Sequence, residues 1–236
     1  MKSVTTITFF RYEGIWNRLW AFWMMQGAHA SLAKVHGLEF YKLMGSGKDG
    51  QFGHDPDWGA YVLLQNWKDE QSATDFFSSD PLMERYRNHA VDRWTLYMNP
   101  IRVKGTWNGQ QPFNTVQMDS MPSFTAVLTR ATLRWKTMRK FWRYVPEAQK
   151  GIFQMPGLRF AKGVGEMPFK HMATFSIWSD VGDITQWAYK NKEHKKAIEM
   201  TKTYDWYSEE MFARFAPYRS EGTWKGERPL PELPQD

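Results

Sequence analysis

The sequence predicts an α+β fold made of two consecutive ferredoxin-like repeats. Strand-like and helix-like segments follow one another in the order β-α-β-β-α-β, and this order occurs twice in 236 residues. Short strings also recur at nearly constant spacing. Gly-Leu-Arg-Phe at 157–160 follows Gly-Leu-Glu-Phe at 37–40 by 120 residues, and Gly-Thr-Trp-Lys-Gly at 222–226 follows Gly-Thr-Trp-Asn-Gly at 105–109 by 117. We therefore expect two sheets face to face, with room for a cavity between sheet and helices.

The first repeat is expected at residues 1–113. Its predicted strands are rich in β-branched and aromatic residues and lie at 4–10, 37–44, 58–67 and 94–103, with a glycine-rich loop at 45–57. The spacing of the apolar residues predicts a helical region at 14–33 and a second helix that is broken near Pro81. One stripe of the first helical region should carry Trp16, Leu19, Trp20, Trp23 and Gly27.

A linker is expected at 114–123 because prolines lie near both of its ends. The second repeat should span 124–228, with a strand at 124–130, a helix at 133–150 and a strand at 171–178. The residues expected to face inward from the first of its helices are Met138, Phe141, Trp142 and Val145. Residues 229–236 contain three prolines, and we expect them to form a flexible tail.

Composition excludes several classes of protein. The chain has no cysteine, which excludes disulfides, thiolate nucleophiles, iron–sulfur clusters and cysteine-ligated haem. Its mean hydropathy is −0.62 and no apolar run approaches 18 residues, so we expect a cytoplasmic protein. The net charge of +6 is dispersed, which does not favour nucleic-acid binding. The chain contains thirteen tryptophans and fourteen methionines. Side chains of these types fill hydrophobic cores, and they also line pockets for large flat or apolar ligands.

Histidine is the strongest candidate for a metal ligand. Ser179 or Asp180 can cap a helix in which His194 falls on an inward stripe with small apolar residues. Such a histidine is either a buried structural residue or an axial ligand. His89 is the rival ligand, whereas His171 begins a strand and is expected at an edge. A two-histidine, one-carboxylate iron site assembled from distant positions is a further alternative.

Other polar motifs carry less weight. Residues 45–50 match G-x-G-x-x-G, but the residues that follow cannot start a helix, so we reject a dinucleotide site and expect a flexible loop that borders a pocket. No G-x-S-x-G string is present for a serine hydrolase. Glu209 and Glu210 are expected on the solvated face of a helix. Arg130 ends a predicted strand, where it is either a surface cation or a clamp for a carboxylate.

With these residues in place, the sequence resembles the spheroidene monooxygenase family, which places oxo groups on acyclic carotenoids. The resemblance covers most of the chain and is strongest in the second repeat. In the first repeat it rests on Phe40, the loop at 45–47, Trp58 and the ending at 105–107. In the second repeat it rests on residues 128–133, 164–169, 174–178 and 213–215, and on His194 with Ala197 and Ile198.

The resemblance implies a pseudo-dimer of the dimeric α/β-barrel type and an O₂-dependent reaction on an acyclic carotenoid. It implies haem b as the cofactor and a ferredoxin-like protein as the electron donor. By matching position it makes His194 the axial ligand of the haem iron. A haem propionate is then one carboxylate that a guanidinium at the end of a strand, that of Arg130, could clamp. A neutral imidazole on one side would leave the other haem face open to O₂. The catalytic residues beyond the haem are not indicated.

Two alternatives stay open at this point. One is a protein that binds haem or an apolar ligand without turnover, and the other is a haem enzyme of the same fold with a small substrate such as an aldoxime. Basic patches would help the protein to sit on anionic lipid, where carotenoids dissolve, and so predict a peripheral contact at the inner face of the membrane. The sequence also allows a homo-oligomer.

Overall fold

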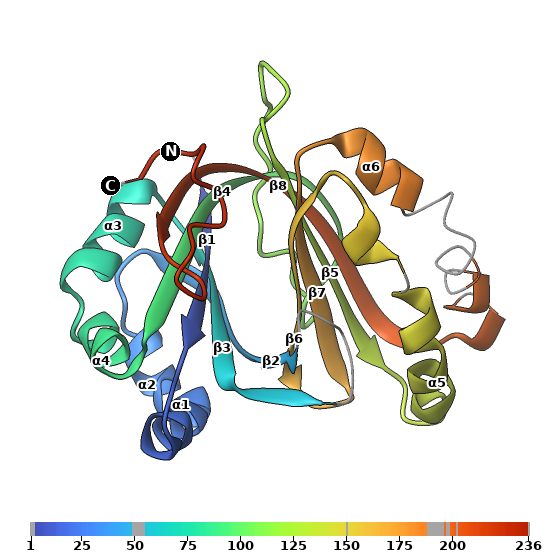
Figure 1. The fold of residues 1–236 in the computed structure, drawn as a ribbon, viewed down its shortest axis with the longest axis horizontal. Helices are drawn as coiled ribbons and strands as arrows, with labels where there is room; N and C mark the ends of the chain where they lie inside the picture. Colours follow the sequence, from blue (N-terminus) through green and yellow to red (C-terminus); the bar gives the residue numbers. More distant parts are fainter. Residues whose placement is uncertain are drawn as a thin grey trace.

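The computed structural model describes residues 3–48, 55–149, 151–187, 196, 199–201 and 203–235, which form a closed barrel of eight antiparallel strands (Figure 1). Around the barrel the strands follow the order β1-β3-β2-β6-β7-β5-β8-β4. Strands of the first half are β1 (Val4–Arg11), β2 (Leu38–Gly47), β3 (Pro56–Trp67) and β4 (Asp92–Gly105). Those of the second half are β5 (Thr125–Leu133), β6 (Leu158–Met167), β7 (His171–Trp178) and β8 (Tyr207–Gly222).

Helices cover the outside of both halves (Figure 1). The first half carries α1 (Ile15–Gly27), α2 (His29–Leu32), α3 (Glu70–Ser79) and α4 (Pro81–His89). The second half carries α5 (Met138–Ala148), the short 3₁₀ helix η2 (Ile152–Gln154) and α6 (Val181–Thr185). Because each half has the strand order 4-1-3-2 with helices on one face, the prediction of two ferredoxin-like repeats is confirmed.

The edge strands of the two sheets are hydrogen-bonded to each other along two seams. One seam is long: β4 pairs with β8 from Trp94–Gly222 to Gly105–Met211. The other joins β2 to β6 only at Gly45–Gly165 and Ser46–Val164. Residues 45–47 are therefore strand and not loop, which corrects the prediction of a loop starting at residue 45.

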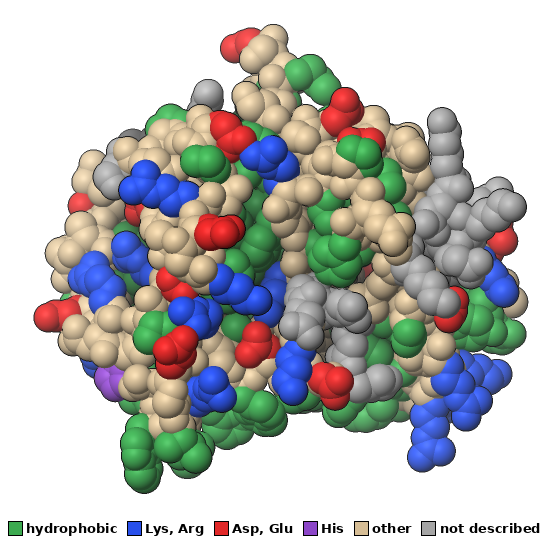
Figure 2. All heavy atoms as spheres, viewed as in Figure 1, with side chains coloured by type: hydrophobic (Ala, Val, Ile, Leu, Met, Phe, Trp, Pro, Cys, Tyr) green, Lys and Arg blue, Asp and Glu red, His purple; other side chains and the backbone are tan. Residues whose placement is uncertain are grey.

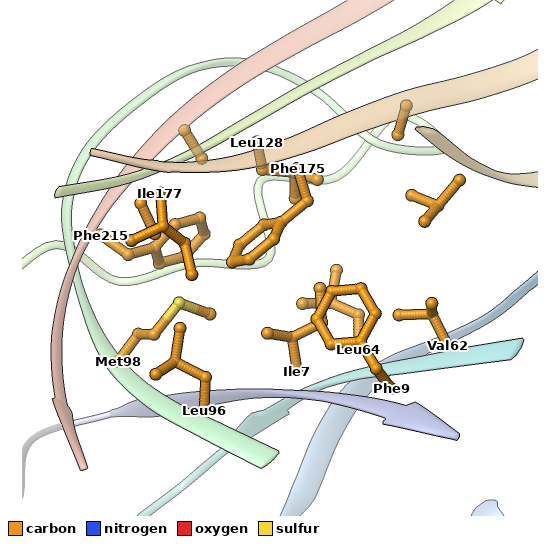
Figure 3. Close-up of a cluster of buried hydrophobic side chains, with 14 of the residues drawn as sticks. Ile7, Phe9, Val62, Leu64, Leu96, Met98, Leu128, Phe175, Ile177 and Phe215 are labelled. Atoms are coloured by element: carbon orange, nitrogen blue, oxygen red, sulfur yellow. The ribbon is translucent and has the colours of Figure 1, made fainter. Parts of the chain in front are cut away.

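The barrel interior is a filled hydrophobic core (Figure 3). Alternate residues of every strand point inward, as a half-buried strand requires. Both halves contribute large side chains to this core, so the two repeats form one folding unit. Labelled members of the core are Ile7, Phe9, Val62, Leu64, Leu96, Met98, Leu128, Phe175, Ile177 and Phe215.

Aspartate side chains cap the starts of three helices. The Asp69 carboxylate accepts the Ser72 N–H at the start of α3, and that of Asp80 accepts the Leu82 N–H at the start of α4, where Pro81 is the first helical residue. This confirms the break near Pro81. Asp180 caps α6 through the Gly182 N–H. In the described part of the chain, no helix is long and apolar enough to cross a membrane.

The C-terminal tail is not free. Leu230 and Leu233 are buried in the barrel core, and the Ser220 N–H donates to the Pro234 carbonyl. Arg159 forms an ion pair with Glu232. The prediction of a flexible tail at 229–236 is therefore wrong for its described residues, because the leucines between the prolines have apolar partners at one end of the barrel.

Candidate functional site

The outer faces of the two sheets differ in the size of their side chains. Because β1 and β5 start in the same register against β3 and β7, each position of one half has a counterpart in the other. At four positions a large outward residue of the first sheet corresponds to a smaller one of the second. The substituted pairs are Tyr41 and Ala161, Leu43 and Gly163, Leu63 and Thr174, and Phe10 and Ala131.

Exposure follows the same contrast. Thr8 and Leu63 lie opposite each other on the first sheet and are fully buried under its helices. Their counterparts, Thr129 and Thr174, also lie opposite each other but are exposed. We call the outward surface around Thr129, Thr174 and Ser176 the outer strip. Among the described residues, no helix covers the sheet at the outer strip.

Two aromatic clusters border the outer strip. Toward α5, a cluster under the helix is built from Leu133, Phe141, Trp142, Val145 and Trp206. Toward α6, a second cluster contains Val127, Trp178, Ile184 and Trp187, with Phe212 packed against it. The strip is therefore a small-residue surface between two bulky apolar walls, as a flat apolar ligand would require.

The predicted helix after residue 180 is described only in its first part. Ile184 and Trp187 are three residues apart and both are buried against Val127 and Trp178 of the sheet. His194, Ala197 and Ile198 lie outside the described residues, so the proposed axial ligand is untested. Between 3 and 48, 55 and 149, and in the later described ranges, no three histidine, aspartate or glutamate side chains are grouped as metal ligands.

Arg130 lies inside the barrel, on the face of β5 opposite to the outer strip. Its side chain is buried, with 1% of its area exposed, and it forms an ion pair with Glu209. Glu209 is on β8 and not on a helix, which corrects the prediction of a solvated helical face. The carboxylate that Arg130 binds in the structure is that of Glu209. Arg130 and Thr129 are neighbours in a strand and point to opposite faces, so Arg130 does not face the outer strip, and its contact with a haem propionate stays a prediction.

Glu209 also holds the hairpin that ends the first half. Its carboxylate accepts the Thr106 hydroxyl at 2.8 Å and the Gly109 N–H at 2.7 Å. Burial by itself would raise the pKa of Glu209, but these donors and Arg130 outweigh it and lower the pKa to about 2. Trp107 then lies over the mouth of the barrel, with the Arg130 guanidinium 5.4 Å from its ring centre.

The opposite end of the barrel repeats this arrangement with the halves exchanged. Asp92 accepts the Thr223 hydroxyl at 2.9 Å and the Lys225 N–H at 3.1 Å, and it pairs with Arg11 at 2.5 Å. Each Gly-Thr-Trp-x-Gly hairpin is thus fixed by a carboxylate of the other half. The repeated string that revealed the two repeats therefore has a structural role, which is to join them.

The mouth near Trp107 also contains ionisable side chains. Lys42 forms an ion pair with Glu166 at 2.7 Å, and the other oxygen of Glu166 accepts the Trp107 indole N–H at 2.8 Å. His171 lies 3.9 Å from Glu166. Burial, together with Arg130 and Lys42, lowers the pKa of His171, and Glu166 opposes this effect. His171 begins β7, which lies between two strands, and it faces the mouth instead of a sheet edge.

His89 ends α4 in the first half, away from the outer strip. Its ring stacks on Trp20 at 3.9 Å, and its Nδ1 donates to the Arg85 carbonyl at 2.9 Å. These contacts suit a structural residue.

Sequence reasoning missed the outer strip, although aligning the repeats position by position would have shown the large-to-small differences.

Comparison with known proteins places the chain in a family. No family model matches the chain. Its sequence is 33% identical over 229 residues to spheroidene monooxygenase of Rhodobacter capsulatus, covering 96% of this chain and 95% of that protein. It is 31% identical to spheroidene monooxygenase of Cereibacter sphaeroides, covering 98% and 72%. A crystal structure of aldoxime dehydratase superimposes with a TM-score of 0.64 at 9% identity, covering 91% and 81%, and therefore shares the fold. On the strength of its sequence relatives, the chain belongs to the spheroidene monooxygenase family.

Proposed function

We propose that this protein is a haem-dependent monooxygenase that introduces oxo groups into acyclic carotenoids. The observation that carries the proposal is sequence identity of 33% to a spheroidene monooxygenase that extends over 96% of the chain, so that both halves of the barrel are matched. The partners of the reaction would be O₂ and a ferredoxin-like electron donor.

The outer strip supports a flat cofactor in the second half. No helix among the described residues covers the sheet at Thr129 and Thr174, whereas Thr8 and Leu63 of the first half are buried under helices. In the sequence, His194 follows the buried Trp187 by seven residues, which is two helical turns. This spacing makes His194 our choice of axial ligand. The described residues around the outer strip fit a flat, largely apolar group, which the two aromatic clusters would hold from either side.

The roles of the protein's own residues follow from this placement. Bound haem would supply the redox centre that activates O₂. The aromatic clusters around Trp142 and Trp187 would exclude water and pack against the polyene, which has no polar group to satisfy. Thr129 and Thr174 provide hydroxyl groups on this face, and each hydroxyl can donate one hydrogen bond and accept others.

Product analysis tests the reaction. The purified protein, supplied with haem, a reductant, a ferredoxin and an acyclic carotenoid such as spheroidene, should yield an oxygenated carotenoid only when O₂ is present. Chromatography with mass detection would show the gain of oxygen. Bound haem with no product from any acyclic carotenoid would refute the proposal and favour a ligand-binding protein.

An optical spectrum tests the cofactor separately. Protein from cells grown with a haem precursor should show a Soret band that shifts or disappears in His194→Ala and persists in His89→Ala. His89 is a matched control because it is a histidine near a helix end in the other repeat. A full band in His194→Ala with loss in His89→Ala would move the ligand to the first half. Absence of the band from the wild-type protein would refute the haem mechanism.

A further inference from the structure

Helix α1 exposes its largest apolar side chains to solvent. Its inward face is made of small or flexible residues, Ala21 and Met24, together with half-buried Trp20. The stripe that carries Trp16 and Trp23 is largely in solvent: Trp16 is 81% exposed and Trp23 is 72% exposed. The exposed large apolar residues here are Ile15, Trp16, Leu19, Phe22 and Trp23, joined by Trp58, whose ring lies 5.8 Å from that of Phe22.

This patch is larger than scattered exposed residues would explain. Figure 2 shows hydrophobic side chains gathered at the lower left edge of the molecule, where Figure 1 places α1. Contiguous apolar patches of this kind mark sites of interaction with a partner or a membrane. The residue types distinguish the two, because tryptophan is enriched where protein meets the headgroup region of a bilayer.

Charge on the same side of the molecule favours a membrane. Helix α5 is the counterpart of α1 in the second half and lies at the same lower edge (Figure 1). Its segment exposes the cations Lys136, Arg139, Lys140 and Arg143, and Figure 2 shows Lys and Arg gathered at that corner. The nearby Trp135 is 65% exposed, with the Lys170 ammonium 4.3 Å from its ring centre.

We propose that the surface formed by α1, Trp58 and the cationic segment at 135–143 docks this protein onto an anionic lipid bilayer. The tryptophans and Phe22 enter the headgroup and acyl boundary, as in other interfacial helices, and the cations contact anionic headgroups. This placement differs from the dispersed basic patches expected from the sequence, because apolar burial at α1 carries the contact. It would also give the second half access to a substrate that dissolves only in lipid, and that consequence rests on the proposed function.

Vesicle flotation tests the docking without any turnover. Wild-type protein should float with phosphatidylcholine vesicles that contain phosphatidylglycerol, more strongly than with phosphatidylcholine alone, and added salt should weaken binding. Trp16→Ser/Trp23→Ser should lower the partition coefficient about a hundredfold, because each buried indole is replaced by a polar side chain. Both positions are exposed, so the fold should be retained, and circular dichroism would verify this.

The matched control is Met118→Ser/Met121→Ser. These two apolar residues are also exposed, at 42% and 77%, but they lie in the linker, which Figure 1 shows at the edge opposite to α1. This variant should bind vesicles as the wild type does. Arg139→Gln/Lys140→Gln should weaken binding to the anionic vesicles only.

Three outcomes would overturn the proposal. The first is wild-type protein that does not float with any vesicle, and the second is a tryptophan variant that floats as well as the wild type. The third is a wild-type protein that forms a dimer and does not bind vesicles, and that becomes monomeric in Trp16→Ser/Trp23→Ser. This result would assign α1 to a contact with a second copy of the chain. Turnover of detergent-dispersed carotenoid should be unchanged in the tryptophan variant, so a failed docking test and a failed enzyme test give different results.

Discussion

Replacing Glu209 by glutamine should destabilise the protein more than any other single charge removal at the barrel mouth. Glutamine keeps the shape of the side chain and can still accept the Thr106 hydroxyl and the Gly109 N–H. It removes the negative charge that faces Arg130, whose side chain is only 1% exposed. The buried guanidinium would then lie opposite a neutral group, and breaking a buried ion pair in this way costs about 3 to 5 kcal/mol.

The pKa of Glu209 gives a second measure of the same interaction. Lowering it from 4.5 to about 2 corresponds to about 3 kcal/mol of stability, which partial exposure of the carboxylate reduces to about 2 to 3 kcal/mol. Both values predict a loss of about 3 kcal/mol at neutral pH, or a fall in Tm of roughly 6 to 12 °C for a chain of this size. Because the folded pKa is depressed, this stabilisation is present above pH 4.5 and is lost as the pH falls toward about 2.

Thermal and urea unfolding, followed by circular dichroism between pH 7 and pH 3, would measure the effect. Glu210→Gln is the matched control, because Glu210 is the next residue of β8 and its side chain is exposed. The gap in stability between wild type and Glu209→Gln should narrow as the pH falls. Equal losses for Glu209→Gln and Glu210→Gln, or a gap that does not change with pH, would refute the reasoning.

Two further predictions concern the ends of the barrel. Gly105→Ala should cost at least about 2 kcal/mol of unfolding free energy, because φ at residue 105 is +88° and a Cβ there would lie 2.1 Å from the Glu210 carbonyl oxygen. Gly109→Ala should cost only about 1 kcal/mol, because φ at residue 109 is +74° but no atom lies within 4 Å of the added Cβ. Urea unfolding of the two variants would compare them, and equal losses would contradict the proposed close approach. Leu230→Ala should cost about 2 to 5 kcal/mol because its side chain is fully buried. An unchanged Tm would instead indicate a tail that does not pack.

The repeat architecture was predictable because it is encoded locally. Strand and helix periods, the Asp80-Pro81 boundary and the repeated Gly-Thr-Trp hairpins are each legible in a short window. The closure of the barrel follows from the family resemblance and not from the residues themselves, since the pairing of Gly45 with Gly165 joins residues that are far apart in sequence and carry no side-chain signal. Gly165 can be recognised only afterwards, because a Cβ there would lie 2.5 Å from the His171 carbonyl oxygen.

Side-chain roles were harder to predict than elements. The sequence shows that Trp16 and Trp23 share one stripe of α1 but not which way that stripe faces. Large apolar residues normally face inward, whereas these two are exposed. From the sequence, Glu209 and Glu210 are expected on the solvated face of a helix, yet they lie in a strand, where alternation turns Glu209 inward and Glu210 outward. The partner of Arg130 followed from this alternation, which no local pattern revealed.

The most direct test of the account is the rate of O₂-dependent carotenoid oxygenation by Thr129→Trp compared with Thr115→Trp. Both positions are exposed threonines, but Thr129 lies in the outer strip and Thr115 lies in the linker. If the reaction takes place over the outer strip, an indole at residue 129 should fill it and lower the rate at least about tenfold, equivalent to about 1.4 kcal/mol in the barrier. Thr115→Trp should react like the wild type. A Thr129→Trp protein that is folded and oxygenates the carotenoid at the wild-type rate would contradict the account.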